Sequence, residues 1–140
     1  MVAKRRFDKD DWAKVLRRLK RAKELVEGKP SEDDLDNAVI QAWSSGEYLI
    51  NACLELKDLP VVRNHTQHVK ARELKDLGVL QGDYFDSLEK LQRYRKAAEY
   101  LGYDAQKTTH YNRQSVVNCI EDVAALLGEV EALLLQEGLI

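Results

Sequence analysis

A helical pattern with a charged residue on its apolar face runs through Leu91-Gln92-Arg93-Tyr94-Arg95-Lys96-Ala97-Ala98-Glu99-Tyr100-Leu101-Gly102-Tyr103-Asp104. In a helix that turns about 100° per residue, Leu88, Leu91, Arg95 and Ala98 all lie within about 40° of Tyr84, on one face of the helix. Arg95 therefore points where a core or interface residue should point, whereas Arg93 lies nearly opposite and faces solvent.

The charge of Arg95 requires a partner if the side chain is buried. A guanidinium stays protonated in a protein, and burying it unpaired is costly. Its partner is then a carboxylate, a row of carbonyl groups, another subunit or an anionic ligand. The alternative is a long side chain that lies over an apolar seam with its charge in water. Both readings remain open on this pattern alone.

The first predicted helix begins after Asp8 or Asp10 and ends at Gly28-Lys29-Pro30. Its outer face carries a basic stripe of Lys14, Arg17, Arg18 and Arg21. This stripe is either a surface for a nucleic-acid backbone or an ordinary solvated face.

The second predicted helix begins at Ser31, where Asp34 three residues later strengthens the capping signal. Ser44-Ser45-Gly46 in its middle are poor helix formers, which indicates either close approach by another helix or a local bend. Trp43 and Tyr48 lie off its apolar stripe and face either a partner or the edge of the core.

Three more helices are predicted in the second half of the chain. A short helix of about ten residues ends at Leu77-Gly78. The fourth helix follows Asp83 as its cap and runs over residues 84–101, and the last helix begins at Asn112 or Ser115. The predicted fold is therefore all-α: one domain over residues 1–140, an antiparallel bundle of four long helices plus one short helix.

Composition restricts the function classes. The 140 residues are 44% hydrophobic and 33% charged, and no run is apolar enough to span a membrane. The first residues lead into charge without a secretory signal, which favours a cytoplasmic protein with no membrane partner. Cys53 and Cys119 fall in apolar helical patterns and are predicted to be reduced core residues.

The sequence carries no motif for a metal or a cofactor. His65 and His68 lie three residues apart, but no Cys or Glu at a recognised spacing completes a zinc site. A phosphate-binding loop, a nucleophile elbow and a di-iron motif are also missing from the sequence. We therefore expect neither a metal nor a cofactor.

Three segments together resemble the HEPN (higher eukaryotes and prokaryotes nucleotide-binding) domain family. Arg95 through Tyr100, followed by Gly102-Tyr103-Asp104, resembles the end of the fourth helix of that family. Residues 37–43 are similar to the start of its long second helix, and residues 64–67 resemble its histidine-containing loop.

In the ribonuclease members of the family, an Arg and, four to six residues later, a His come from each of two subunits. Arg95 keeps the first half of this motif, but Tyr100 stands where the His would be. A histidine with its usual pKa of about 6.5 exchanges protons at neutral pH, whereas a tyrosine with a pKa of about 10 rarely does. The resemblance thus implies Arg95 and Tyr100 as a degenerate catalytic pair.

The residues expected to contact a nucleotide or RNA are Arg95, Tyr100, Tyr103, His65 and His110. The aromatic rings and histidines among them offer stacking surfaces for a base. The resemblance further implies a homodimer that works with a minimal nucleotidyltransferase in a toxin–antitoxin or related defence system. Tyr103 lies near the position at which such an enzyme adenylylates toxin members of the family.

Two other readings remain. In one, the protein is a helical interaction module without ligand or catalysis, and Arg95 forms a structural salt bridge with Glu47 or Glu55. In the other, it is an active metal-independent endoribonuclease in spite of Tyr100.

Overall fold

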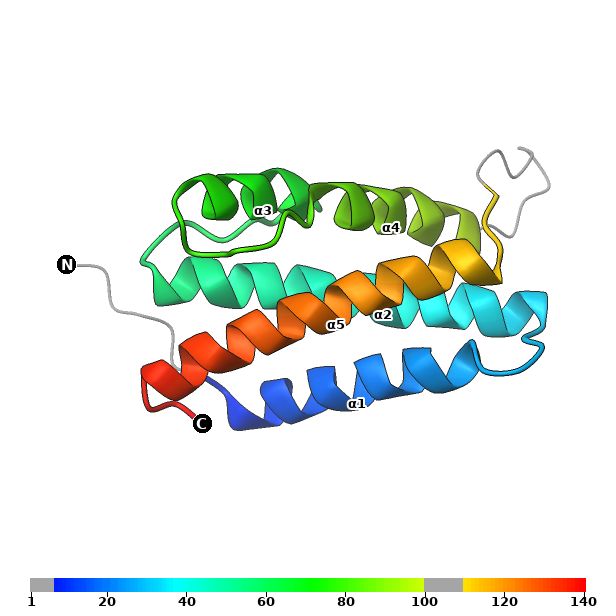
Figure 1. The fold of residues 1–140 in the computed structure, drawn as a ribbon, viewed down its shortest axis with the longest axis horizontal. Helices are drawn as coiled ribbons and strands as arrows, with labels where there is room; N and C mark the ends of the chain where they lie inside the picture. Colours follow the sequence, from blue (N-terminus) through cyan, green and yellow to red (C-terminus); the bar gives the residue numbers. More distant parts are fainter. Residues whose placement is uncertain (1–6, 100–109) are drawn as a thin grey trace.

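The structure, a computed structural model, describes residues 7–99 and 110–140. These residues form helices and no strand (Figure 1), so the all-α prediction is confirmed. The helices are α1 Lys9–Leu25, α2 Glu32–Leu56, α3 Gln67–Asp76, α4 Phe85–Ala98 and α5 Arg113–Gln136.

The starts of α1, α2 and α5 follow the capping residues of the sequence. The Asp8 carboxylate accepts the backbone N–H groups of the first turn of α1, and Ser31 and Asp34 form a reciprocal capping box on α2. Asn112 and Ser115 form a second capping box on α5, so both candidates for that start take part in it. A polar side chain at such a position satisfies backbone donors that the helix itself leaves without acceptors.

The N-cap of α4 is Tyr84 and not the predicted Asp83, although the Asp83 carboxylate accepts the backbone N–H of Phe85 at 3.0 Å.

Helix α2 lies at the centre of the molecule and contacts each of the other four helices. In Figure 1, α1 lies on one side of it, α3 and α4 lie on the other, and α5 crosses in front. Its buried residues include Ala38, Val39, Ala42, Leu49, Ile50, Cys53 and Leu54. The single hydrophobic core is thus built around α2.

Gly46 in the middle of α2 allows α4 to approach closely. A Cβ atom at this position would lie 2.6 Å from Leu88 Cδ2 of α4 and 3.7 Å from Val123 Cγ2 of α5. Of the two readings of the small-residue segment, close approach is therefore the correct one.

The buried face of α4 differs from the predicted one. Its buried residues are Leu88, Leu91, Tyr94 and Ala97, whereas Arg95 and Ala98 are only half-buried. Helix α4 packs against both α2 and α5, and the Tyr94 ring lies 4.9 Å from that of Tyr111. The buried surface is therefore centred one residue away from the predicted stripe, and Arg95 lies on its border toward α2.

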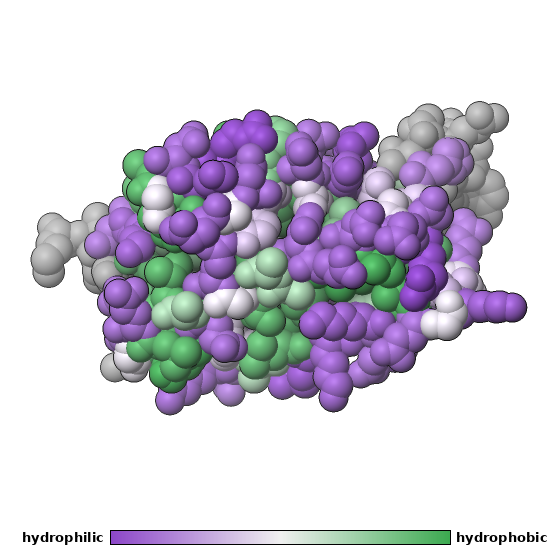
Figure 2. Space-filling view, in the orientation of Figure 1, coloured by the Kyte–Doolittle hydropathy of each residue, from purple (hydrophilic) through white to green (hydrophobic). Residues whose placement is uncertain are grey.

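Apolar side chains gather along α5 and between α5 and α1 on the face shown in Figure 2. Half-buried residues on α5 include Val117, Ala124, Leu127 and Leu133, and Leu16 of α1 is 38% exposed. The apolar side chains of α5 therefore extend from the core to the surface of the molecule.

None of the helices in the described part of the chain is long and apolar enough to cross a lipid bilayer.

Both cysteines are expected to resist modification in the native protein. Cys53 and Cys119 are buried and unpaired, as predicted, and burial raises the pKa of the Cys53 thiol to about 12 and that of Cys119 to about 11. The thiolate is the reactive form, so at about pH 8 almost none is present. A chromogenic disulfide reagent should label neither cysteine until urea unfolds the chain, and rapid labelling of the native protein would contradict their burial.

Candidate functional site

Trp43 on α2 is the centre of a polar cluster that joins three parts of the chain. The guanidinium carbon of Arg95 on α4 lies 4.4 Å from the centroid of the indole ring. The imidazole ring of His65, from the segment between α2 and α3, lies 5.3 Å from it at an interplanar angle of 54°. The indole Nε1 donates a 2.9 Å hydrogen bond to Oε1 of Gln92 on α4.

The Arg95 side chain is 18% exposed and is only partly paired within the protein. Its Nη1 donates to Oε2 of Glu99 at 3.0 Å, one helical turn away, and its planar head group stacks on Trp43. Its Nε is buried and has no hydrogen-bond acceptor among the described residues. The side chain thus keeps unused donor capacity in a fixed position.

His65 is held beside Trp43 by a carboxylate and by an unusual backbone conformation. Its Nδ1 lies 3.1 Å and 3.0 Å from the two carboxylate oxygens of Glu47 on α2. The backbone at His65 has φ = 62°, in the left-handed region that few non-glycine residues adopt. The ring remains 45% exposed and is therefore accessible at the surface.

Glu47 lies deeper than His65, with 16% of its side chain exposed. Burial raises the pKa of its carboxyl group, and the hydrogen bond with His65 and the positive charges of His65 and Arg95 only partly oppose this effect. The ion pair of Arg95 is with Glu99, so neither Glu47 nor Glu55 is the direct salt-bridge partner that the interaction-module reading named. Glu47 instead acts on Arg95 through space.

The raised pKa of Glu47 predicts a specific pH dependence of stability. Above pH 4.5 the folded protein holds this proton more tightly than the unfolded chain does, so folding stability falls as the pH rises through the folded-state pKa. A Glu47→Gln variant lacks this loss, and its free energy of unfolding should increase relative to the native protein as the pH rises above 4.5. Urea unfolding at several pH values measures the difference.

The matched control is Glu73→Gln, which removes an exposed carboxylate that pairs with Lys70 at 3.0 Å on the surface of α3. It should leave the pH dependence unchanged. A constant difference between Glu47→Gln and the native protein over the whole pH range would contradict the raised pKa.

Of the other three predicted ligand-binding residues, the structure describes only His110, which is not part of the Trp43 cluster. Tyr100 and Tyr103 lie outside the described residues. His110 is exposed and lines a separate shallow cavity next to Tyr111, whose hydroxyl group donates to Asp36 on α2. No contact described in the structure joins His110 to Trp43. Of the five predicted residues, the structure brings together Arg95 and His65.

The basic stripe of α1 is partly tied to the protein itself. Arg18 is half-buried, and its Nη1 donates a 2.7 Å hydrogen bond to Ser44 Oγ on α2. Arg21 pairs with Glu24 on the surface at 3.6 Å. Arg18 is therefore held against α2, and the charge of Arg21 is partly balanced by the neighbouring carboxylate.

His65 and His68 do not share a site. His65 contacts Glu47, whereas the His68 ring packs edge-on against Phe85 at 5.2 Å between centroids. In residues 7–99 and 110–140, no group of three or more His, Cys, Asp or Glu side chains is placed to hold a metal ion.

The arrangement can bind an anion beside an aromatic surface. Arg95 supplies a positive charge, Trp43 a flat apolar ring, and His65 a ring nitrogen that donates or accepts a hydrogen bond. The sequence singled out Arg95 and His65, but it left Trp43 facing either a partner or the edge of the core and indicated no role for Gln92. The one signal for Trp43 in the sequence was its position four residues before Glu47, which places this large aromatic side chain on the same helix face as Glu47.

Comparisons with known proteins find no matching family model, no matching curated protein and no matching solved structure.

Proposed function

We propose that the protein is a HEPN-type homodimer, with the antiparallel bundle of that family, that binds a nucleotide or RNA at the surface around Arg95 and Trp43. It works with a minimal nucleotidyltransferase in a toxin–antitoxin or related defence system. The observation that carries the proposal is the position of the Arg95 guanidinium over the Trp43 ring with His65 on the same ring. Arg95 and His65 belong to two separate segments that resemble the family.

The chemistry of these side chains suits a nucleotide. A guanidinium presents donors in a planar fork that matches a phosphate, and only one of those of Arg95 is used by Glu99 in the described structure. Aromatic and imidazole rings stack on bases, and each stacked base contributes about 1–3 kcal/mol to binding of single strands. A phosphate on Arg95 would also satisfy a positive charge that burial otherwise makes unfavourable.

The exposed apolar residues along α5 support the homodimer. Half-buried aliphatic side chains lie on this helix, and apolar surface extends between α5 and α1 (Figure 2). A second copy that covers this face would remove the apolar surface from water.

Binding, and not cleavage, is proposed because Tyr100 replaces the histidine that would transfer protons.

A helical interaction module is the second candidate, and a specific observation favours it. The Arg95–Glu99 ion pair and the stacking on Trp43 satisfy part of the guanidinium inside one chain. In this reading the side chain covers the edge of the core and meets no ligand.

Fluorescence anisotropy with a labelled single-stranded RNA, together with light scattering, tests the proposal. We expect saturable binding with a Kd of about 10 μM at moderate salt, and a mass twice that of the 16.1 kDa chain. Incubation with labelled ATP and a nucleotidyltransferase encoded next to the gene tests for transfer of an adenylyl group. A 16.1 kDa monomer that binds neither RNA nor ATP would exclude the proposal.

If the protein is a dimer but binds neither ligand, the interaction module becomes the supported function. RNA degradation that disappears in an Arg95→Ala variant would instead establish the endoribonuclease reading.

A further inference from the structure

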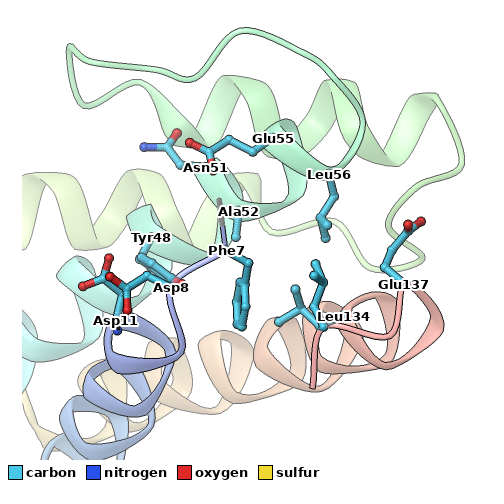
Figure 3. A pocket seen from close by; sticks show the side chains of 11 residues that line it. Phe7, Asp8, Asp11, Tyr48, Asn51, Ala52, Glu55, Leu56, Leu134 and Glu137 are labelled. Atoms are coloured by element: carbon cyan, nitrogen blue, oxygen red, sulfur yellow. Dashed lines mark hydrogen bonds between the residues drawn. The ribbon is translucent and has the colours of Figure 1, made fainter. Parts of the chain in front are cut away.

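A cavity of about 410 Å³ lies near the start of α1, between the second half of α2 and the end of α5. Figure 3 shows the Phe7 ring inside it, with side chains of α2 and α5 around it. Its apolar lining consists of Phe7, Tyr48, Ala52, Leu56, Leu134 and Leu139. The volume is that of a small-molecule site, and it shares no lining residue with the cluster around Trp43.

The charged side chains among the described lining residues are all acidic. Asp8, Asp11, Glu55 and Glu137 contribute carboxylates, and no Lys, Arg or His is among the described residues that line the cavity. The Asp8 carboxylate caps α1. The structure gives no hydrogen bond or ion pair to the carboxylates of Asp11 and Glu137 within its described ranges.

The geometry also separates these two carboxylates. In Figure 3, Asp11 lies next to Asp8 and Tyr48, and Glu137 lies on the other side of Phe7 near Leu134. A ligand that enters between them meets negative charge at its edge and apolar surface at its centre.

We infer that this cavity binds a small organic cation, an amine or guanidinium attached to an apolar or aromatic body. Carboxylates next to a low-dielectric wall attract a cation more strongly than the same groups in water. The rings of Phe7 and Tyr48 provide a second attraction that does not depend on the carboxylates, because the face of an aromatic ring also attracts a cation. An anion of the same shape is repelled, and a fully hydrated metal ion gains nothing from the apolar lining.

Two probes of matched shape and opposite charge test this inference, namely phenethylamine and 3-phenylpropionate. Titration calorimetry and amide chemical shifts follow the binding of each to the full chain. We expect the amine to bind at least about tenfold more tightly than the acid and to shift the amides of Asn51, Leu134 and Leu139. Equal affinity for the two probes, or no saturable shift at these amides, would overturn the inference.

Charge-removing variants give the second readout. Asp11→Asn and Glu137→Gln should each weaken amine binding about threefold to tenfold without changing the fold. Glu121→Gln removes an exposed carboxylate of α5 outside the cavity and should leave binding unchanged. If all three variants bind the amine as the native protein does, the carboxylates do not select the ligand and the inference fails.

A larger side chain in the lining tests whether the amine binds inside the cavity or only to carboxylates on the surface. Ala52→Leu places extra atoms into the half-buried lining of α2 and should reduce amine binding at least about tenfold. Circular dichroism checks that the variant is folded. Unchanged binding by a folded Ala52→Leu protein would show that the amine binds outside the cavity, which also overturns the inference.

Discussion

Replacing Arg95 with alanine should weaken RNA binding about thirtyfold, because it removes charge-assisted contacts worth about 2 kcal/mol. The loss of folding stability should be smaller, about 1 kcal/mol, since the side chain contributes one half-exposed ion pair and one stacking contact on Trp43. Arg95→Lys keeps the charge but not the planar fork, and its affinity should lie between those of the native protein and the alanine variant. Anisotropy at fixed salt and urea unfolding measure the two effects separately.

Arg93→Ala is the matched control for this experiment. Arg93 lies on the same helix and forms the same kind of pair, with Glu89 at 3.2 Å one turn away, but its side chain is exposed. Its removal should change RNA affinity by less than about threefold. Arg95→Ala protein that binds RNA as tightly as the native protein, while losing several kcal/mol of stability, would favour the interaction module.

Replacing Gly46 with leucine should destabilise the fold by about 3 kcal/mol and lower the Tm by roughly 10 °C. A Cβ at Gly46 already lies 2.6 Å from Leu88 Cδ2, and the leucine side chain adds three more atoms to a site without space for them. Either Leu88 leaves its rotamer or α4 moves away from α2. Thermal unfolding followed by circular dichroism measures the change.

Two further variants test the steric cause. Gly128→Ala on α5 also replaces a helical glycine, but nothing lies within 4 Å of the added atom, so it should stabilise the protein by about 0.5–1 kcal/mol. Combining Gly46→Leu with Leu88→Ala restores part of the space and should recover part of the stability. A Gly46→Leu protein as stable as the native one would show that the contact between α2 and α4 is not tight.

The helices could be predicted from the sequence because their limits depend on local interactions. Backbone N–H groups at most three residues away donate to the side chains of Asp8, Ser31 and Asn112. Contacts over so short a distance in the sequence can be predicted from residue type and spacing. The buried face of α4 was less predictable. The prediction used a single apolar face, which suits a helix that packs against one neighbour. Helix α4 packs against both α2 and α5, and Tyr94 is buried in place of Arg95.

The candidate site could be predicted only in part, since its contacts join distant segments. Arg95 and His65 meet on Trp43, and the backbone at His65 takes a left-handed conformation that is uncommon for a residue other than glycine. Glu47 was named only as a salt-bridge partner, and its hydrogen bond with His65 depends on the same turn. The acidic cavity was not predicted, since its lining comes from three elements that are remote in the sequence.

The central position of α2 has a consequence for how the protein loses its structure. From Ala38 to Leu56, no residue of this helix is fully exposed, and all four other helices lie against it. Detaching any one of them would uncover apolar surface on α2 and weaken the support for the remaining three. Partly unfolded forms are therefore unfavourable, and the bundle should come apart as one cooperative unit and not helix by helix.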